Sequence, residues 1–190
     1  MRTPAGYQSL NIFLLSRDLL LELVEECMAH DRYSFRRNVL QEKGKLLRFN
    51  GYVWDGFAAR INTIQAYYQR SMELLRPEIR AELFCAQRPV YAKENDAAST
   101  YIDPSGECIN SLISDGCDIQ GSIRNCILFR GVRVEKGAHV ENSVLFKNTV
   151  VKAGANVRCV IADKNVEFGP DVTMAGHPQY PLVVEKNTKL

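Results

Sequence analysis

The chain has 190 residues, 46% of them apolar, so it is long enough to bury one domain core or two small ones. Its 24 Lys and Arg residues are balanced by 22 Asp and Glu residues and are scattered, which excludes the phosphate-backbone footprint of a nucleic-acid-binding protein. No apolar run is long enough to span a membrane, and the residues after Met1 lack the apolar core of a signal peptide. We therefore expect a cytoplasmic protein with neither a nucleic-acid nor a membrane partner.

The six cysteines predict neither a disulfide framework nor a zinc site. Cys108, Cys117 and Cys126 lie nine residues apart, and the sequence has no Cys-x-x-Cys pair. In a reducing compartment such cysteines behave as small buried apolar side chains. We expect none of them to hold a metal ion.

Residues 1–86 are expected to form a mixed α and β segment. The stretch from Ser9 to Leu15 is apolar and of strand length, and it leads to Ser16, a suitable N-cap for a helix over 17–29. In that helix the apolar residues recur at spacings of three and four. A second short strand is expected around 46–49, followed by a hairpin turn at Asn50-Gly51.

Two more helices are predicted before the character of the sequence changes. One runs over about 63–75 with Asn62 as its cap, and Pro77 opens a short one that ends near Phe84. Residues 87–105 then contain two prolines and small polar residues without periodicity, which is typical of a linker. We place the domain boundary there.

After the linker the sequence repeats itself. Segments that begin at Asn110, Asn125 and Asn142 share an Asn-(Ser/Cys)-aliphatic-aliphatic pattern, and a degraded fourth copy begins at Arg158. Inside the copies aliphatic residues recur every six residues, as in the series Leu128, Val134 and Val140. Fixed internal periods of this kind are the signature of repeat architectures.

A period of six residues is typical of a left-handed parallel β-helix, in which each hexad forms a short strand and a turn. We expect this fold over 106–176, in a domain over 106–190 that the strand at Tyr180–Glu185 caps. An antiparallel meander explains alternation but not the sixfold spacing. Six glycines fall at or near the expected corners, where a turn often needs positive φ: Gly116, Gly121, Gly131, Gly137, Gly154 and Gly169. The fold class is therefore an α+β segment followed by an all-β, single-stranded left-handed parallel β-helix.

Five segments carry a family resemblance: 9–15, 50–68, 88–91, 110–119 and 143–146. Together they resemble the C-terminal half of the ADP-glucose pyrophosphorylase (glucose-1-phosphate adenylyltransferase) family, and within it the GlgD-type subunits of glycogen biosynthesis. The resemblance implies that residues 1–86 are the C-terminal remnant of a nucleotidyltransferase domain. It also implies a family reaction in which ATP and glucose 1-phosphate give ADP-glucose and diphosphate.

The resemblance further implies that this chain alone is inactive. Catalytic members hold Mg²⁺ with an Asp, and the matching position here is Arg60, a cation that opposes the binding of Mg²⁺. A second acidic stretch of the family corresponds to Tyr33–Asn38, where both acidic residues are replaced. The Gly-rich phosphate loop has no counterpart in the sequence. We expect no catalytic residue and no cofactor in this chain, whose β-helix instead assembles with, and modulates, a catalytic subunit.

A few residues keep alternative interpretations. Ser9 matches a family serine near the glucose phosphate and is the candidate substrate contact. Asp55 is the nearest carboxylate to Arg60 and is a candidate displaced ligand, although Asp-Gly is a common turn pair. Arg60 itself suits either a phosphate or a carboxylate across a subunit boundary.

Two further expectations follow. Many hexapeptide β-helices are acyltransferases with a histidine base, so His139, with His177 in the tail, supports an alternative function. The unpaired strand at 9–15, or an open end of the β-helix that exposes Val166 and Val172, predicts a homo- or hetero-oligomer.

Overall fold

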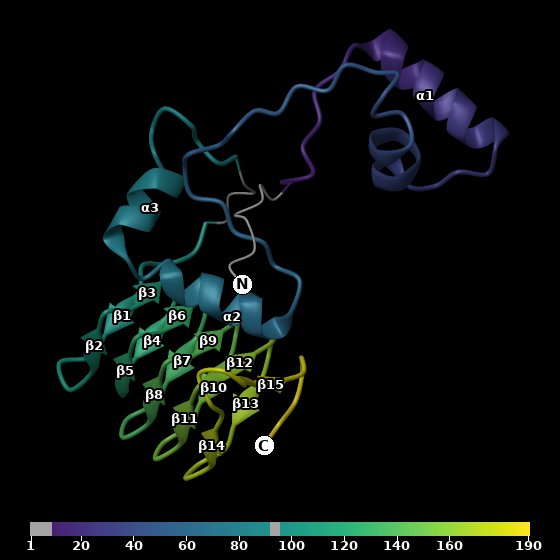
Figure 1. The fold of residues 1–190 in the computed structure, drawn as a ribbon. Helices are drawn as coiled ribbons and strands as arrows, with labels where there is room; N and C mark the ends of the chain where they lie inside the picture. The colour runs from purple at the N-terminus through teal and green to yellow at the C-terminus, as the bar shows by residue number, and fades with distance from the viewer. Residues whose placement is uncertain (1–8, 92–95) are drawn as a thin grey trace, which may run out of the picture. The chain divides into compact units, whose positions relative to one another are not determined.

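The computed structural model describes residues 9–91 and 96–190 and divides the chain into two compact units, residues 1–58 and residues 59–190 (Figure 1). The first unit contains helix α1 (Arg17–Ala29) and the π-helix η1 (Phe35–Gln41). The second contains α2 (Ile64–Glu73), α3 (Pro77–Leu83) and all fifteen strands that the structure assigns within the described residues.

Helix α1 has the predicted bounds, and Ser16 is its N-cap. The Ser16 Oγ accepts a hydrogen bond from the Leu19 amide at 3.4 Å, which satisfies one of the free amides of the first turn. The two strands predicted in this unit are wrong. Residues 9–15 and 46–49 are extended or irregular, because neither segment has a neighbouring strand to pair with among the described residues.

The π-helix η1 was not predicted from the sequence. Ser34 caps it by accepting a hydrogen bond from the Arg37 amide at 3.3 Å. Its one buried residue is Val39, and Leu23 is the buried residue of α1. These are the only buried apolar side chains of the described part of this unit.

Helices α2 and α3 confirm the prediction with one correction. The N-cap of α2 is Thr63 rather than Asn62, because the Thr63 Oγ1 accepts a hydrogen bond from the Ala66 amide at 3.0 Å. Pro77 opens α3 as expected, since a proline at this position has no amide to leave unsatisfied.

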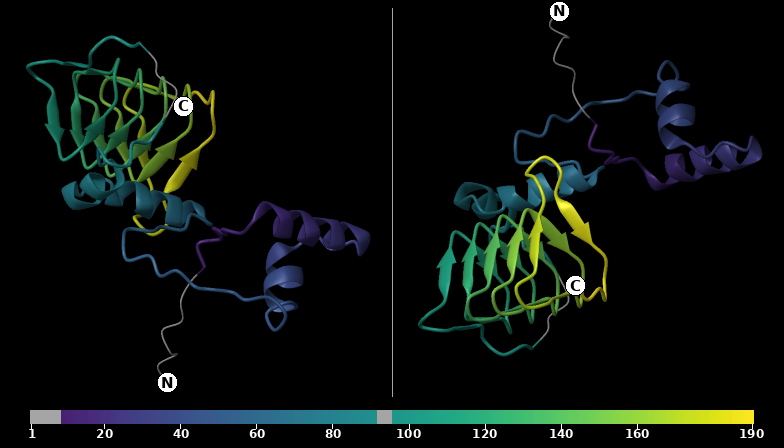
Figure 2. Two further views of the ribbon diagram at one scale, coloured as in Figure 1. Left: turned by 90° about the horizontal axis from the view of Figure 1, so that it is seen from above. Right: turned by 90° about the horizontal axis from the view of Figure 1, so that it is seen from below.

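Residues 101–184 confirm the left-handed parallel β-helix. The strands form three five-stranded parallel sheets with the orders β1-β4-β7-β10-β13, β14-β11-β8-β5-β2 and β15-β12-β9-β6-β3 (Figures 1 and 2). The bounds are β1 (Tyr101–Ile102), β2 (Glu107–Ile109), β3 (Leu112–Ile113), β4 (Asp118–Ile119), β5 (Ser122–Arg124), β6 (Ile127–Leu128), β7 (Arg133–Val134), β8 (His139–Glu141), β9 (Val144–Leu145), β10 (Val150–Val151), β11 (Asn156–Arg158), β12 (Val160–Ala162), β13 (Glu167–Phe168), β14 (Thr173–Ala175) and β15 (Leu182–Val184).

The repeats stack in register, with one correction to the fourth copy. Asn110, Asn125 and Asn142 each have positive φ at a corner, and a ladder of side-chain hydrogen bonds joins them at 2.8 and 3.2 Å. The next residue in this column is Cys159, with φ of 53°, rather than Arg158. Four of the six corner glycines also have positive φ, whereas Gly121 and Gly169 do not.

Helix α2 packs along one side of the coils (Figure 2). Tyr68 and Leu75 lie against Ile127, Val144 and Ile161, which point outward from three successive strands of one sheet. Helices α2 and α3 lie within residues 1–86, which the sequence analysis treats as one segment. In the structure they belong to the unit of the β-helix. The assignment of 1–86 to one nucleotidyltransferase remnant, with a linker over 87–105, stays a prediction.

Candidate functional site

The N-terminal end of the β-helix is an open coil. Its inward-facing side chains are Ile102, Cys108 and Ile113, one from each sheet. Ile102 is 46% exposed and Cys108 is also exposed, whereas their partners in the next coil, Ile119 and Ile123, are fully buried. The end of the shaft therefore presents an apolar face to its surroundings.

The same end carries unpaired strand edges. Strands β1, β2 and β3 each pair with one neighbour, β4, β5 and β6 respectively, and with no second strand in the described part of the chain. Asn110 is the last rung of the asparagine ladder, and its side chain donates to Asn125 at 2.8 Å. A face with free backbone groups, a ladder end and apolar side chains is suited to a further coil of polypeptide.

At the C-terminal end, in contrast, the inward-facing side chains Phe168 and Val184 are buried, although the last strands β14 and β15 also pair with one neighbour each among the described residues. Strand β15 continues one sheet, as the sequence predicted for the capping segment. Residues 188–190 cover the last strand of another sheet, where the Gly169 amide donates to the Leu190 carbonyl at 2.8 Å. Val166 is fully buried and Val172 is partly buried, so the alternative of an open C-terminal end that exposes both residues is wrong.

Sequence reasoning missed the open end because it began the β-helix at residue 106. The first strand lies within the predicted linker, where Tyr101 and Ile102 pair with Asp118 and Ile119. Ile102 lies 17 residues before Ile119, its partner in the next coil, and this spacing equals one of the repeat steps in the sequence. The repeat step itself was the signal that identifies the first coil.

Ser9 and Arg60 lie in different units, and both are exposed. The Ser9 Oγ accepts a hydrogen bond from the Asn11 amide at 3.1 Å, which is a local turn contact. Arg60 lies in the irregular segment before Thr63 and forms no ion pair within residues 9–91 and 96–190. The assignment of Ser9 to a sugar phosphate and of Arg60 to the metal position both stay predictions.

The expectation that this chain holds no Mg²⁺ stays a prediction. This ion is held by carboxylate oxygens, and no group of three or more His, Cys, Asp or Glu side chains comes together in the part of the chain that the structure covers. Asp55 is exposed, in the turn where the Trp54 indole donates to the Phe57 carbonyl at 3.3 Å. We derive no metal-dependent step from these residues.

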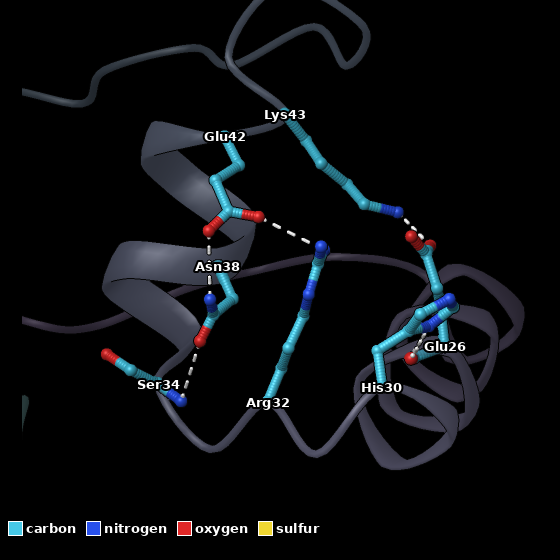
Figure 3. A network of polar contacts seen from close by, with 7 residues as sticks. All are labelled: Glu26, His30, Arg32, Ser34, Asn38, Glu42 and Lys43. Carbon is cyan, nitrogen blue, oxygen red and sulfur yellow. Dashed lines mark hydrogen bonds and ion pairs between the residues drawn. The ribbon is translucent and has the colours of Figure 1, made fainter.

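The stretch that replaces the second acidic motif of the family belongs to a polar network (Figure 3). Asn38 donates to Glu42 at 2.9 Å and accepts from the Ser34 amide at 3.2 Å. Glu42 also pairs with Arg32 at 3.0 Å. The contacts of Asn38 join the start and the end of η1, so its visible role is structural.

Glu26 and Lys43 form the second ion pair of the network. The hydrogen bond from Lys43 lowers the pKa of the Glu26 carboxyl, which favours the charged form of this side chain. Lys43 follows η1 closely and Glu26 lies in α1, so the pair joins the two helices of the first unit.

The histidines of the alternative function lie apart. His139 is exposed on β8, and its imidazole has no hydrogen bond or ion pair among the described residues. The His177 Nδ1 accepts a hydrogen bond from the Gln179 amide at 3.2 Å. Two open grooves of about 520 and 480 Å³ lie beside α2. The first is mostly apolar and the second includes Glu73 and Arg76, but neither contains a histidine. Neither groove therefore pairs a histidine base with a binding surface in the described part of the chain, and the acyltransferase alternative gains no support from them.

The comparison with protein families agrees with the fold. The family model described as GlmU-like, C-terminal hexapeptide, matches residues 97–179. No helix among the described residues is long and apolar enough to cross a membrane.

Three relatives place the chain more narrowly. It is 40% identical over 181 residues to "Glycogen biosynthesis protein GlgD" of Bacillus subtilis, a match that covers 94% of this chain and 52% of the relative. The protein of the same name in Geobacillus stearothermophilus is 35% identical, with 95% and 52% covered. The "Glucose-1-phosphate adenylyltransferase" of Geobacillus stearothermophilus is 28% identical over 139 residues, with 70% and 35% covered. The chain thus spans about half the length of the GlgD relatives that it matches.

Proposed function

The chain belongs to the glucose-1-phosphate adenylyltransferase (ADP-glucose pyrophosphorylase) family, to its GlgD type, and from this premise we propose that it acts in glycogen biosynthesis as a non-catalytic subunit. Its β-helix binds a catalytic glucose-1-phosphate adenylyltransferase subunit and modulates that enzyme. Geobacillus stearothermophilus has both a GlgD and a glucose-1-phosphate adenylyltransferase among the relatives, so the two kinds of protein coexist in one organism.

The observation that carries the proposal is the asymmetry of the β-helix ends. At the C-terminal end the chain's own tail helps to bury the inward-facing apolar side chains, whereas Ile102 and Cys108 at the other end are exposed. Burial of one aliphatic side chain of this size stabilises a complex by about 1.5–3 kcal/mol. A partner that presents its own β-helix end satisfies the strand edges as well as the apolar side chains.

The non-catalytic role is supported by the chemistry of the described residues. Arg60 occupies the position where the family resemblance expects a metal-binding Asp, and no carboxylate cluster replaces it in the described chain. The cation disfavours the binding of Mg²⁺ at this position. The proposed contribution of this chain to the reaction is therefore indirect, through the subunit it binds.

The proposal is tested by initial-rate measurements on a catalytic subunit encoded in the same genome. The rate of ADP-glucose formation from ATP and glucose 1-phosphate is measured with increasing amounts of the chain. We expect the chain alone to be inactive and to change kcat or KM of the catalytic subunit saturably. Turnover by the chain alone, or no change at saturating concentrations, contradicts the proposal.

A further inference from the structure

Each of the three first strands of the β-helix has a carboxylate beside it. Asp103 follows β1 directly, Glu107 is the first residue of β2, and Asp115 lies two residues after β3. Glu107 and Asp115 are exposed, and Asp103 is partly buried. These three residues form an acidic rim on the apolar end that Ile102 and Cys108 present. The open end therefore carries charge of one sign on all three of its sides.

The acidic rim belongs to the first coil alone. In the second coil the strand register places Gln120, Ser122 and Arg130 at the three corresponding positions, and none of them is acidic. Residues 96–123 contain five Asp or Glu residues and no Lys, Arg or His, whereas residues 124–190 contain ten Lys or Arg residues and six Asp or Glu residues. The acidic charge is thus concentrated at the open end and does not continue along the β-helix.

No ion pair within the described chain neutralises the acidic rim. None of the ion pairs among residues 9–91 and 96–190 includes one of its carboxylates. Glu107 accepts a hydrogen bond from the Ser122 hydroxyl at 2.9 Å, and Asp103 accepts one from the Ser105 amide at 2.8 Å. The hydrogen bonds from Ser105 lower the pKa of the Asp103 carboxyl, which favours its charged form.

This charge distinguishes between the partners that could cover the apolar end. Two copies of this chain that met through their open ends would form a two-fold interface, in which each acidic rim faces the same rim of the other copy. Like charges that face each other disfavour such a contact. A partner with Lys or Arg side chains around an apolar coil end, in contrast, gains electrostatic attraction as well as burial of the apolar side chains.

We propose that the acidic rim selects the partner of the open end. It favours a β-helix end with a basic rim, in the catalytic subunit, and it opposes the pairing of two copies of this chain. The inference rests on the proposed function and adds to it the chemistry of the partner surface. The apolar side chains alone do not provide this selection, because they would be buried equally well by a second copy.

The first experiment measures the affinity of the full chain for the catalytic subunit of the same genome by sedimentation velocity at two salt concentrations. We expect Kd to rise about tenfold between about 50 and about 500 mM NaCl, because salt screens exposed charges. Glu107→Lys weakens the complex about fivefold or more at the lower concentration, whereas Glu185→Lys, the same charge change at an exposed residue after β15, leaves it unchanged. An affinity that is independent of salt, or an equal effect of the two variants, overturns the proposal.

The second experiment tests self-pairing without any partner. The double variant Glu107→Gln and Asp115→Asn removes two charges but keeps the shapes of the side chains and the oxygen that accepts from Ser122. We expect this variant to self-associate about tenfold more tightly than wild type at low salt. Ile102→Glu in the same background removes the increase, because it places a charge in the apolar end itself. Wild type that self-associates as tightly as the double variant overturns the proposal.

The two experiments separate this inference from the proposed function. If wild type forms no complex with the catalytic subunit at either salt concentration, the proposed function is contradicted, and self-association of the double variant still decides whether the acidic rim opposes self-pairing. If Ile102→Glu weakens the complex but neither salt nor Glu107→Lys affects it, the proposed function stands and the selection by charge is wrong.

Discussion

Tyr68 is expected to hold α2 on the β-helix, and its replacement tests whether the two elements fold together. The side chain is 4% exposed, and its hydroxyl donates to the Asn142 carbonyl at 2.6 Å. Tyr68→Phe keeps the ring but leaves the partly buried Asn142 carbonyl without this donor. Because an unsatisfied buried group costs about 1–3 kcal/mol, we expect the free energy of unfolding to fall by roughly 1–2 kcal/mol.

The assay is chemical and thermal unfolding of the full chain. A loss of this size lowers Tm by roughly 2–8 °C in a protein of this length, whereas Tyr68→Ala, which also leaves a cavity, costs about 3–5 kcal/mol. Tyr180→Phe is the matched control, because Tyr180 is in the same unit and exposed. An equal stability of wild type and Tyr68→Phe refutes the argument that this hydrogen bond anchors the helix.

The same residue gives a signed pH dependence. Burial raises the pKa of Tyr68 above its ordinary value near 10. The folded state therefore holds the phenolic proton more tightly than the unfolded state, and the stabilisation is complete below about pH 10 and is lost as the pH rises further. Wild type must lose stability above pH 10 more steeply than Tyr68→Phe. An equal dependence of the free energy of unfolding on pH in wild type and Tyr68→Phe contradicts the burial of the Tyr68 hydroxyl.

Three further predictions test the turns, the thiols and one ion pair. Gly137→Ala is expected to cost about 1–2 kcal/mol in unfolding measurements, because Gly137 has φ of +77°, whereas Gly51→Ala, in open space, changes stability little. In alkylation followed by mass spectrometry near pH 8, Cys126, whose pKa burial raises to about 12, reacts only after unfolding. A hydrogen bond from Arg88 lowers the pKa of Cys85, so this thiol is expected to react in the native chain. Faster alkylation of Cys126 than of Cys85 in the native chain contradicts the surroundings assigned to both thiols. Lys152 donates a hydrogen bond to the Glu167 carboxylate and lowers the pKa of that carboxyl, so the pair stabilises the fold above about pH 4.5 and less as the pH falls. In Glu167→Gln the free energy of unfolding is therefore expected to fall less as the pH is lowered. An equal fall in wild type and variant excludes a stabilising contribution of this ion pair.

The β-helix was predictable because its determinant is a repeat. The sixfold spacing places one aliphatic side chain per hexad in the shaft, and stacked coils bury it whatever lies elsewhere in the chain. The error of one residue at Arg158 arose because Cys159 takes the corner position that asparagine has in the other copies. The open end was missed because strand β1 lies in a stretch with two prolines and small polar residues, which is typical of a linker.

The first unit was harder to predict because a strand forms only where a second strand pairs with it. Residues 9–15 have the composition of a strand, but strand geometry requires a second backbone that the described chain does not provide. The π-helix over Phe35–Gln41 has no established sequence pattern and is rare. Helix α1 was correct to the residue because its cap and its apolar spacing are local signals.

The residues of the candidate site also differ in how far the sequence could identify them. The sequence identified Ser9 and Arg60 through resemblance, and the structure shows both as exposed residues with local surroundings. The repeat step could have located the first coil, but the exposure of Ile102 could be recognised only in the structure, because Ile102 has the same residue type as the fully buried Ile119. A difference between two identical side chains in neighbouring coils is a property of the fold, not of the residue.

Sedimentation velocity of the chain mixed with the catalytic subunit of the same genome tests the central claim most directly. The account predicts a heteromeric complex for wild type and at least a tenfold weaker complex for Ile102→Glu. Val183→Glu, which places the same charge at an exposed valine of the C-terminal end, leaves the complex unchanged. No complex with wild type, or equal weakening by both variants, contradicts assembly through the open end of the β-helix.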